Sequence, residues 1–213
     1  MGRARVDRRV AGFGIMGGLL MLFGDMCFYM IPVSGADFNP TSVIMDMPLN
    51  RLILGGILGP LAGLLYAAGS ILFYFIFRAY NALLARILTL LFVVMFILGG
   101  AAHSIYPTYG FIPHGDMSHM REKITALIGA LNTVSIVSGV AATFLLFFMT
   151  IKYKNAYPKW LLLLTPTLWA LMNPYITPYA PYPFGSITGG WTNLCFTVYF
   201  TVAMFVFGRK RTG

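Results

Sequence analysis

The sequence predicts an all-α integral membrane protein, a bundle of six transmembrane helices with the N and C termini in the cytoplasm. Three observations predict this fold class. First, 58% of the 213 residues are hydrophobic and only 10% are charged, whereas soluble domains carry about 25% charged residues. Second, apolar residues fall into six long runs. Third, lysine and arginine are concentrated in alternate connections between these runs. The composition excludes an ordinary soluble domain or a disordered chain.

The six runs are each long enough to cross a bilayer, which takes about 20 apolar residues in a helix. We expect spans at about 11–33, 52–77, 83–106, 124–151, 160–179 and 187–207, within a single transmembrane domain that covers residues 1–213. The fourth run is long and is expected to tilt. The fifth is broken by Pro166, Pro174 and Pro178.

The first run resembles a signal peptide because four arginines precede it. However, it is longer than the 7–15 apolar residues of a signal, and it contains Asp25. We therefore expect a retained helix. In the second run, Gly55, Gly59 and Gly63 recur at four-residue spacing, a pattern that favours close helix packing.

The basic residues predict the orientation, because cytoplasmic connections are enriched in lysine and arginine. Twelve of the fifteen lie in the N-terminal tail, between the second and third spans, between the fourth and fifth spans, and in the C-terminal tail. The other three are Arg51, Arg121 and Lys123. The net charge of +9 is therefore a topology signal, and we expect membrane lipid, not nucleic acid, as a partner.

Asp25 and His103 are the candidate catalytic residues. Asp25 lies inside the first span and His103 near the outer end of the third. An ionisable side chain within a span is costly unless it faces the bundle interior, so it indicates a functional site. A protonated aspartate bonded to a neighbouring helix, and an interfacial histidine, are the structural alternatives.

Three asparagines, Asn132, Asn173 and Asn193, are expected at nearly the same depth as Asp25, because each lies near the middle of its run. They are candidates for substrate binding, or alternatively for hydrogen bonds between helices. Aromatic residues near the outer side complete the predicted substrate-binding set, which comprises Trp169, Tyr175, Trp191, Tyr29 and Tyr106. Interfacial belts of aromatic residues are the simpler explanation for most of them.

The outer loop before the fourth span contains His114, Asp116 and His119. This spacing is compatible with a zinc site, and nearby methionines are compatible with Cu(I). A polar connection explains the loop equally simply, so no metal site is favoured and no cofactor is expected.

These features lead to three functional hypotheses. The first is an enzyme that acts by acid/base chemistry on a lipid-like or isoprenoid-like substrate in an outward-facing cavity, as a cyclase-like lyase, an isomerase or a hydrolase. The second is a small transporter or binding protein coupled to protons or cations. The third is a metal-handling protein that uses the outer loop. The sequence predicts neither the substrate nor the oligomeric state.

Three short motifs resemble those of uncharacterised bacterial six-span membrane families whose domains have no known function. They are Gly24-Asp25-Met26, the run 51–56 and the run 99–104. The resemblance covers roughly the first half of the chain. It implies a bacterial inner membrane protein and implies no activity.

Overall fold

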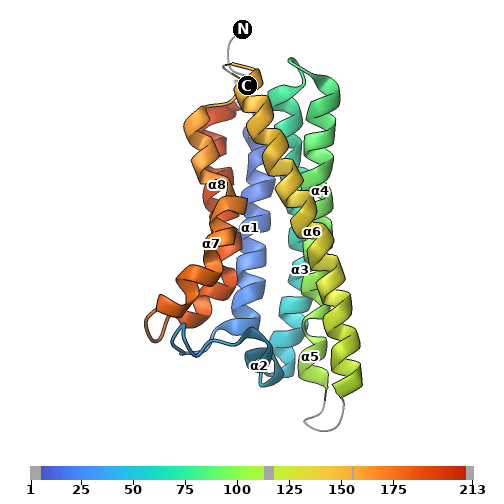
Figure 1. Ribbon diagram of the computed structural model, residues 1–213, viewed down its shortest axis with the longest axis vertical. Coiled ribbons are helices and arrows are strands. Elements are labelled where there is room, and N and C mark those ends of the chain that lie inside the picture. The colour runs from blue at the N-terminus through green and yellow to red at the C-terminus, as the bar shows by residue number, and fades with distance from the viewer. Residues whose placement is uncertain (1–5, 113–117, 155, 210–213) are drawn as a thin grey trace.

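The computed structural model describes residues 6–112, 118–154 and 156–209, and this part of the chain is almost entirely helical (Figure 1). The long helices are α1 (Arg8–Tyr29), α3 (Leu49–Phe77), α4 (Ala82–Ile105), α6 (Ser118–Lys152) and α8 (Trp191–Phe207). The short ones are α2 (Pro40–Met45), α5 (Thr108–Phe111), α7 (Pro166–Ile176) and the 3-10 helices η1 (Lys159–Leu164), η2 (Thr177–Tyr179) and η3 (Gly185–Gly190). Two-residue strands β1 (Val6–Asp7) and β2 (Gly208–Arg209) pair in parallel.

Five helical segments among the described residues are long and apolar enough to cross a membrane. They coincide with five of the six predicted spans. The sixth predicted span, 160–179, is not among these five. The break that its prolines predicted is present, because that segment is divided into η1, α7 and η2. Pro166 begins α7, Pro174 lies inside it and Pro178 lies in η2, and proline lacks the backbone N–H that a continuous helix requires.

This broken segment nevertheless carries the chain from one end of the bundle to the other. The pairing of β1 with β2 places both ends of the described chain at one end of the molecule, which we call the terminal end (Figure 1). Helices α6 and α8 both run toward the terminal end. The chain must therefore return to the opposite, distal end between them, and η1 and α7 make that passage.

Helix α3 packs closely between α1 and α4 through its glycines. A Cβ atom built on Gly63 would lie 2.8 Å from the carbonyl oxygen of Phe96, and one on Gly69 would lie 2.6 Å from the Cα of Gly14. Backbones at this separation leave no room for a side chain. The expected packing role of the glycine stripe is thus confirmed at Gly63, and the stripe extends along α3.

The interior contains two apolar clusters separated along the bundle axis. The larger cluster fills the terminal half with aromatic rings, including Phe73, Phe92 and Tyr199. The smaller one, around Phe28 and Ile44, lies at the distal end. Asp25 lies on α1 between residues of the two clusters.

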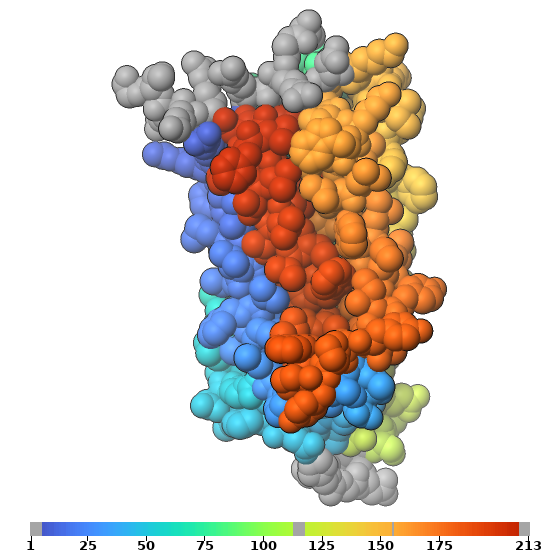
Figure 2. Space-filling model, turned by 90° about the vertical axis from the view of Figure 1, so that its left-hand side faces the viewer, coloured from blue at the N-terminus to red at the C-terminus, as the bar shows by residue number. Residues whose placement is uncertain are grey.

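The outer surface is also strongly apolar. Phe144, Leu163 and Phe205 are at least 70% exposed. Figure 2 shows one such side, where α8 lies between α1 and the segment that contains α7. A surface of this kind is unfavourable in water and, together with the five apolar helices, is compatible with a multi-pass membrane protein.

Arg51, one of the three basic residues predicted on the outer side, has a structural role. It lies in the first turn of α3, and its guanidinium donates hydrogen bonds to the carbonyl oxygens of Cys27 (2.9 Å), Met26 (2.8 Å) and Met30 (3.2 Å). These carbonyls lie in and just after the last turn of α1, where few carbonyls have a partner within the helix; that of Met26 also accepts from the backbone N–H of Met30 at 3.1 Å. Arg51 therefore caps α1 and opposes the negative end of its dipole.

Candidate functional site

Asp25 and His103 are in direct contact in the bundle interior. The imidazole Nε2 of His103 lies 3.1 Å from Oδ1 of Asp25. Both residues are buried, with 5% and 6% of their surfaces exposed. The contact joins α1 to α4, helices whose glycine-rich faces both pack against α3. It brings together the two predicted catalytic residues, which are 78 positions apart in the chain.

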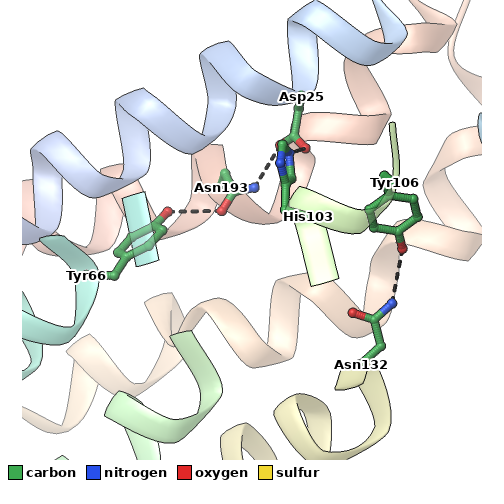
Figure 3. A network of polar contacts seen from close by, with 6 residues as sticks. All are labelled: Asp25, Tyr66, His103, Tyr106, Asn132 and Asn193. Carbon is green, nitrogen blue, oxygen red and sulfur yellow. Dashed lines mark hydrogen bonds and ion pairs between the residues drawn. The ribbon is translucent and has the colours of Figure 1, made fainter. Parts of the chain in front are cut away.

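Asn193 on α8 and Tyr66 on α3 extend this contact into a network (Figure 3). The hydroxyl of Tyr66 donates to Oδ1 of Asn193 at 3.1 Å, and Nδ2 of Asn193 donates to Oδ2 of Asp25 at 2.7 Å. The bond from Tyr66 holds the side-chain amide of Asn193 in the orientation that points its NH₂ group at the carboxylate of Asp25. Asp25 is therefore in contact at both oxygens, accepting from Asn193 at Oδ2 and meeting His103 at Oδ1.

The imidazole of His103 is fixed by its surroundings. The ring of Phe28 stacks on it, with the ring centroids 4.6 Å apart. On α3, a Cβ atom at Gly59 would lie only 2.7 Å from the Cβ of His103 and 2.8 Å from its Nδ1. Only glycine at position 59 leaves space for this histidine. The Nδ1 atom is fully buried and has no hydrogen-bond partner among the described residues.

A cavity of about 440 Å³ adjoins the network. Asp25, His103, Asn193 and Tyr66 contribute to its wall, and most of the remaining lining is apolar. Helices α1, α3, α4, α6, α7 and α8 all contribute residues. The site is thus a polar wall in a largely apolar chamber.

Tyr106 and Asn132 form a second polar pair in the same cavity. Nδ2 of Asn132 donates to the hydroxyl of Tyr106 at 3.0 Å, which ties α6 to the end of α4. Both residues line the cavity, as does the predicted Tyr29. A bound molecule could therefore be oriented from two sides, by Asn193 and by Asn132.

We infer that the cavity reaches the molecular surface at the seam between α6 and α7, because exposed residues of both helices line it. Two of its lining residues, Ile136 and Leu171, are 60% and 58% exposed. They lie near the middle of their helices. We call this seam the side opening.

The distal end of the bundle is covered by two connecting segments. The segment before α2 and the segment around η3 are joined by hydrogen bonds from Gly185 N to the carbonyl oxygen of Val33 (2.9 Å) and from Gly35 N to that of Ala180 (2.8 Å). The hydroxyl of Ser186 also donates to the carbonyl oxygen of Ile31 (2.7 Å). The proline-rich segment therefore forms a cover over this end.

Four of the predicted substrate-binding residues are not among those that line the cavity: Asn173, Trp169, Tyr175 and Trp191. Asn173 donates to the carbonyl oxygen of Thr188 at 3.2 Å and accepts from the hydroxyl of Thr177. The indole of Trp191 donates to the carbonyl oxygen of Trp169, and that of Trp169 to Leu163. Tyr175 is 76% exposed. The three asparagines are thus not brought together, because the breaks around α7 direct Asn173 toward η3.

The weak metal candidates of the outer loop fall largely outside the described residues. His114 and Asp116 both lie there, whereas His119 is in the first turn of α6 and exposed. Within the part of the chain that the structure describes, no group of three or more histidine, cysteine, aspartate or glutamate side chains is placed to hold a metal ion.

The sequence reasoning missed Tyr66 and Phe28. Tyr66 lies three residues after Gly63 and therefore continues the glycine face of α3 toward the network. Extending that stripe by one turn would have identified it. Phe28 had no such signal, because an aromatic residue in a span is ordinary until its neighbour is known.

The match to known families covers nearly the whole chain. Residues 5–210 match a family of unknown function, DUF6796. The chain belongs to that family. This agrees with the resemblance to domains of unknown function seen in the sequence. The chain matches no curated protein and no solved structure.

Proposed function

We propose that this member of DUF6796 is a membrane-embedded enzyme that acts by proton transfer on a lipid-like or isoprenoid-like molecule held in the intramembrane cavity. The observation that carries the proposal is the Asp25–His103 contact at 3.1 Å in the wall of a cavity of about 440 Å³. In this proposal Asp25 is the proton-accepting group. His103 holds the carboxylate and serves as the second acid/base group.

The composition of the cavity supports a hydrophobic substrate. Small-molecule sites are mostly apolar pockets of about 300–1,000 Å³ with a few polar groups that fix orientation. Here the apolar wall would hold the body of the molecule, while Asn193 and Asn132 orient its polar part. Asp25 is bonded to Asn193 and His103 but also borders the cavity, and an ionisable group of this kind inside a span supports a functional role.

The position of the opening supports entry from the membrane. Ile136 and Leu171 border the seam between α6 and α7 at mid-depth, so a lipid could enter without crossing water. Toward the terminal end, the aromatic cluster around Phe73 and Tyr199 packs the interior. This one-sided access favours an enzyme over a transporter, which must reach both sides.

The topology proposed with this function has six crossings and both termini in the cytoplasm of a bacterial cell. The paired terminal strands and the return passage through α7 support the six crossings. The concentration of basic residues toward the terminal end supports the orientation. A C-terminal green fluorescent protein fusion is expected to fluoresce, and a C-terminal alkaline phosphatase fusion to be inactive. An active phosphatase fusion would overturn the orientation.

The functional proposal is tested by native mass spectrometry of the detergent-purified protein, followed by incubation with the lipid extract of its host cells. We expect a retained hydrophobic molecule, and a product that wild type forms and Asp25→Asn does not. Asp37→Asn, which removes an exposed carboxylate outside the cavity, is the matched control. Unchanged conversion by Asp25→Asn would exclude Asp25 as the reacting group, and uptake into vesicles without conversion would favour a transporter.

A further inference from the structure

The proton count of the Asp25–His103 pair follows from the burial of one atom. Nδ1 of His103 is fully buried, with no hydrogen-bond partner among the described residues and no access for water. Buried N–H groups without a partner are rare because they lose the full hydrogen bond to water. An imidazolium would place a proton on Nδ1, and so would an aspartic acid that donates to Nε2. The arrangement that leaves no orphan N–H has the proton on Nε2 and a bare carboxylate on Asp25.

The pair therefore carries one net negative charge, and the cavity wall holds no compensating cation. Within the described part of the chain, no lysine or arginine lines the cavity. Arg51, at the start of α3, is committed to the carbonyls at the end of α1. A carboxylate can accept about four hydrogen bonds, and the two known donors leave acceptor positions free.

The rest of the wall also suits a positive charge. The aromatic rings of Tyr29, Tyr66, Tyr106, Phe96 and Phe196 line the same cavity. Aromatic faces attract ammonium groups, and aromatic side chains recur in the sites where proteins bind quaternary ammonium ligands. A phosphate or carboxylate head would instead meet Asp25 without any arginine or lysine to pair with it.

We propose that the ligand of this cavity is a lipophilic cation, with an apolar chain or isoprenoid-like body and an ammonium head that pairs with Asp25 among the aromatic rings. The inference rests on the proposed function and narrows its substrate class. An inorganic cation is disfavoured by the same wall. Ca²⁺ takes about 6–8 oxygen ligands and Mg²⁺ about six, whereas this wall is largely apolar around a single carboxylate.

The test compares three probes that share one octyl chain and differ only in the head: octyltrimethylammonium, 1-octanol and octyl phosphate. Binding is measured by isothermal titration calorimetry on the full chain in an uncharged maltoside micelle. We expect wild type to bind the ammonium probe at least about tenfold more tightly than the phosphate, with the alcohol between them. Asp25→Asn should weaken ammonium binding by about tenfold and leave alcohol binding nearly unchanged. Asp37→Asn should bind all three as wild type does.

The outcomes separate the two proposals. Equal affinity for the three probes, or preference for the phosphate, would overturn the cationic ligand while leaving a lipid-binding cavity intact. The absence of binding by every probe would overturn both. Tight binding of Na⁺ or Ca²⁺ alone that competes with the ammonium probe would also overturn the proposal. The comparison of heads on wild type needs no variant, so the test stands even if Asp25→Asn does not fold.

Discussion

Gly59→Ala should separate His103 from Asp25 without altering either residue. The added Cβ would lie 2.7 Å from the Cβ of His103 and 2.8 Å from its Nδ1. The first distance is about 0.7 Å short of the 3.4 Å at which ordinary contact begins. Because Phe28 stacks on the imidazole, the ring is also restricted on its face. His103, or α4 with it, must therefore move. A shift of this size would break the 3.1 Å contact between His103 and Asp25.

The magnitude follows from two opposing effects. Overpacking a filled interior costs about 1–3 kcal/mol. Replacing glycine by alanine within a helix gains about 0.5–1 kcal/mol. We therefore expect Gly59→Ala to lower the free energy of unfolding by about 1–2 kcal/mol, and to reduce binding of the ammonium probe.

Two other glycines provide the controls. Gly12 on α1 has no atom within 4 Å of its Cβ position, so Gly12→Ala should be neutral or stabilising. Gly63→Ala crowds the backbone of Phe96 at 2.8 Å and should destabilise with a smaller effect on binding. Unfolding in detergent and probe titration give the two readouts. The reasoning is refuted if Gly59→Ala is as stable as Gly12→Ala and binds the probe normally.

Four further predictions concern the cap, the terminal half (two of them) and the side opening. Arg51→Ala should lower the free energy of unfolding by about 2 kcal/mol, because carbonyls at the end of α1 lose charged donors. Lys123→Ala, at an exposed position, should change it by less than about 0.5 kcal/mol. Equal effects of the two variants would contradict the cap. Tyr157→Phe should lower the free energy of unfolding by about 1–2 kcal/mol, because the buried Tyr199 hydroxyl, 2.5 Å away, loses its partner. The double variant Tyr157→Phe/Tyr199→Phe should lower it by less than the sum of the two single variants. Additive losses would argue against the hydrogen bond. Burial, with the Tyr199 hydroxyl as the second cause, raises the pKa of Tyr157 well above its ordinary value, so the stability from this neutral phenol is fully present below about pH 10 and is lost as the pH rises further. Because exposed tyrosines also ionise, the readout is the difference in phenolate absorbance near pH 10 between the folded Tyr199→Phe and Tyr157→Phe/Tyr199→Phe proteins, and a difference of one phenolate would contradict this. Leu171→Trp should slow ligand entry between α6 and α7 without lowering stability, and unchanged association kinetics would refute the side opening.

Much of the helical architecture was predictable because the membrane imposes a strong composition rule. A span needs about 20 apolar residues whatever it packs against, so five of the predicted runs coincide with long helices. At 160–179 the three prolines predicted a broken segment, and the structure divides it into η1, α7 and η2. The sequence did not give the bounds of these pieces, because proline marks where a helix is interrupted but not how the chain continues beyond it.

The candidate site was predictable in part for the same reason. Asp25 and His103 stood out as costly groups in apolar runs, and the structure brings them into contact. Asn193 and Asn132 line the cavity beside them, while Asn173 does not. Depth along each run can be counted from the sequence, but rotation about the helix axis cannot, and rotation decides which side chain meets which.

The sequence by itself indicated a membrane-spanning chain with a small set of polar groups inside its apolar runs. It could do so because the cost of placing a polar or charged group in hydrocarbon is a property of each residue. The tertiary structure decided that Tyr66 orients Asn193, that Gly59 makes room for His103, and that the chamber reaches the surface beside α7. These outcomes depend on distances between helices far apart in the chain, and such distances are set by close packing of whole surfaces.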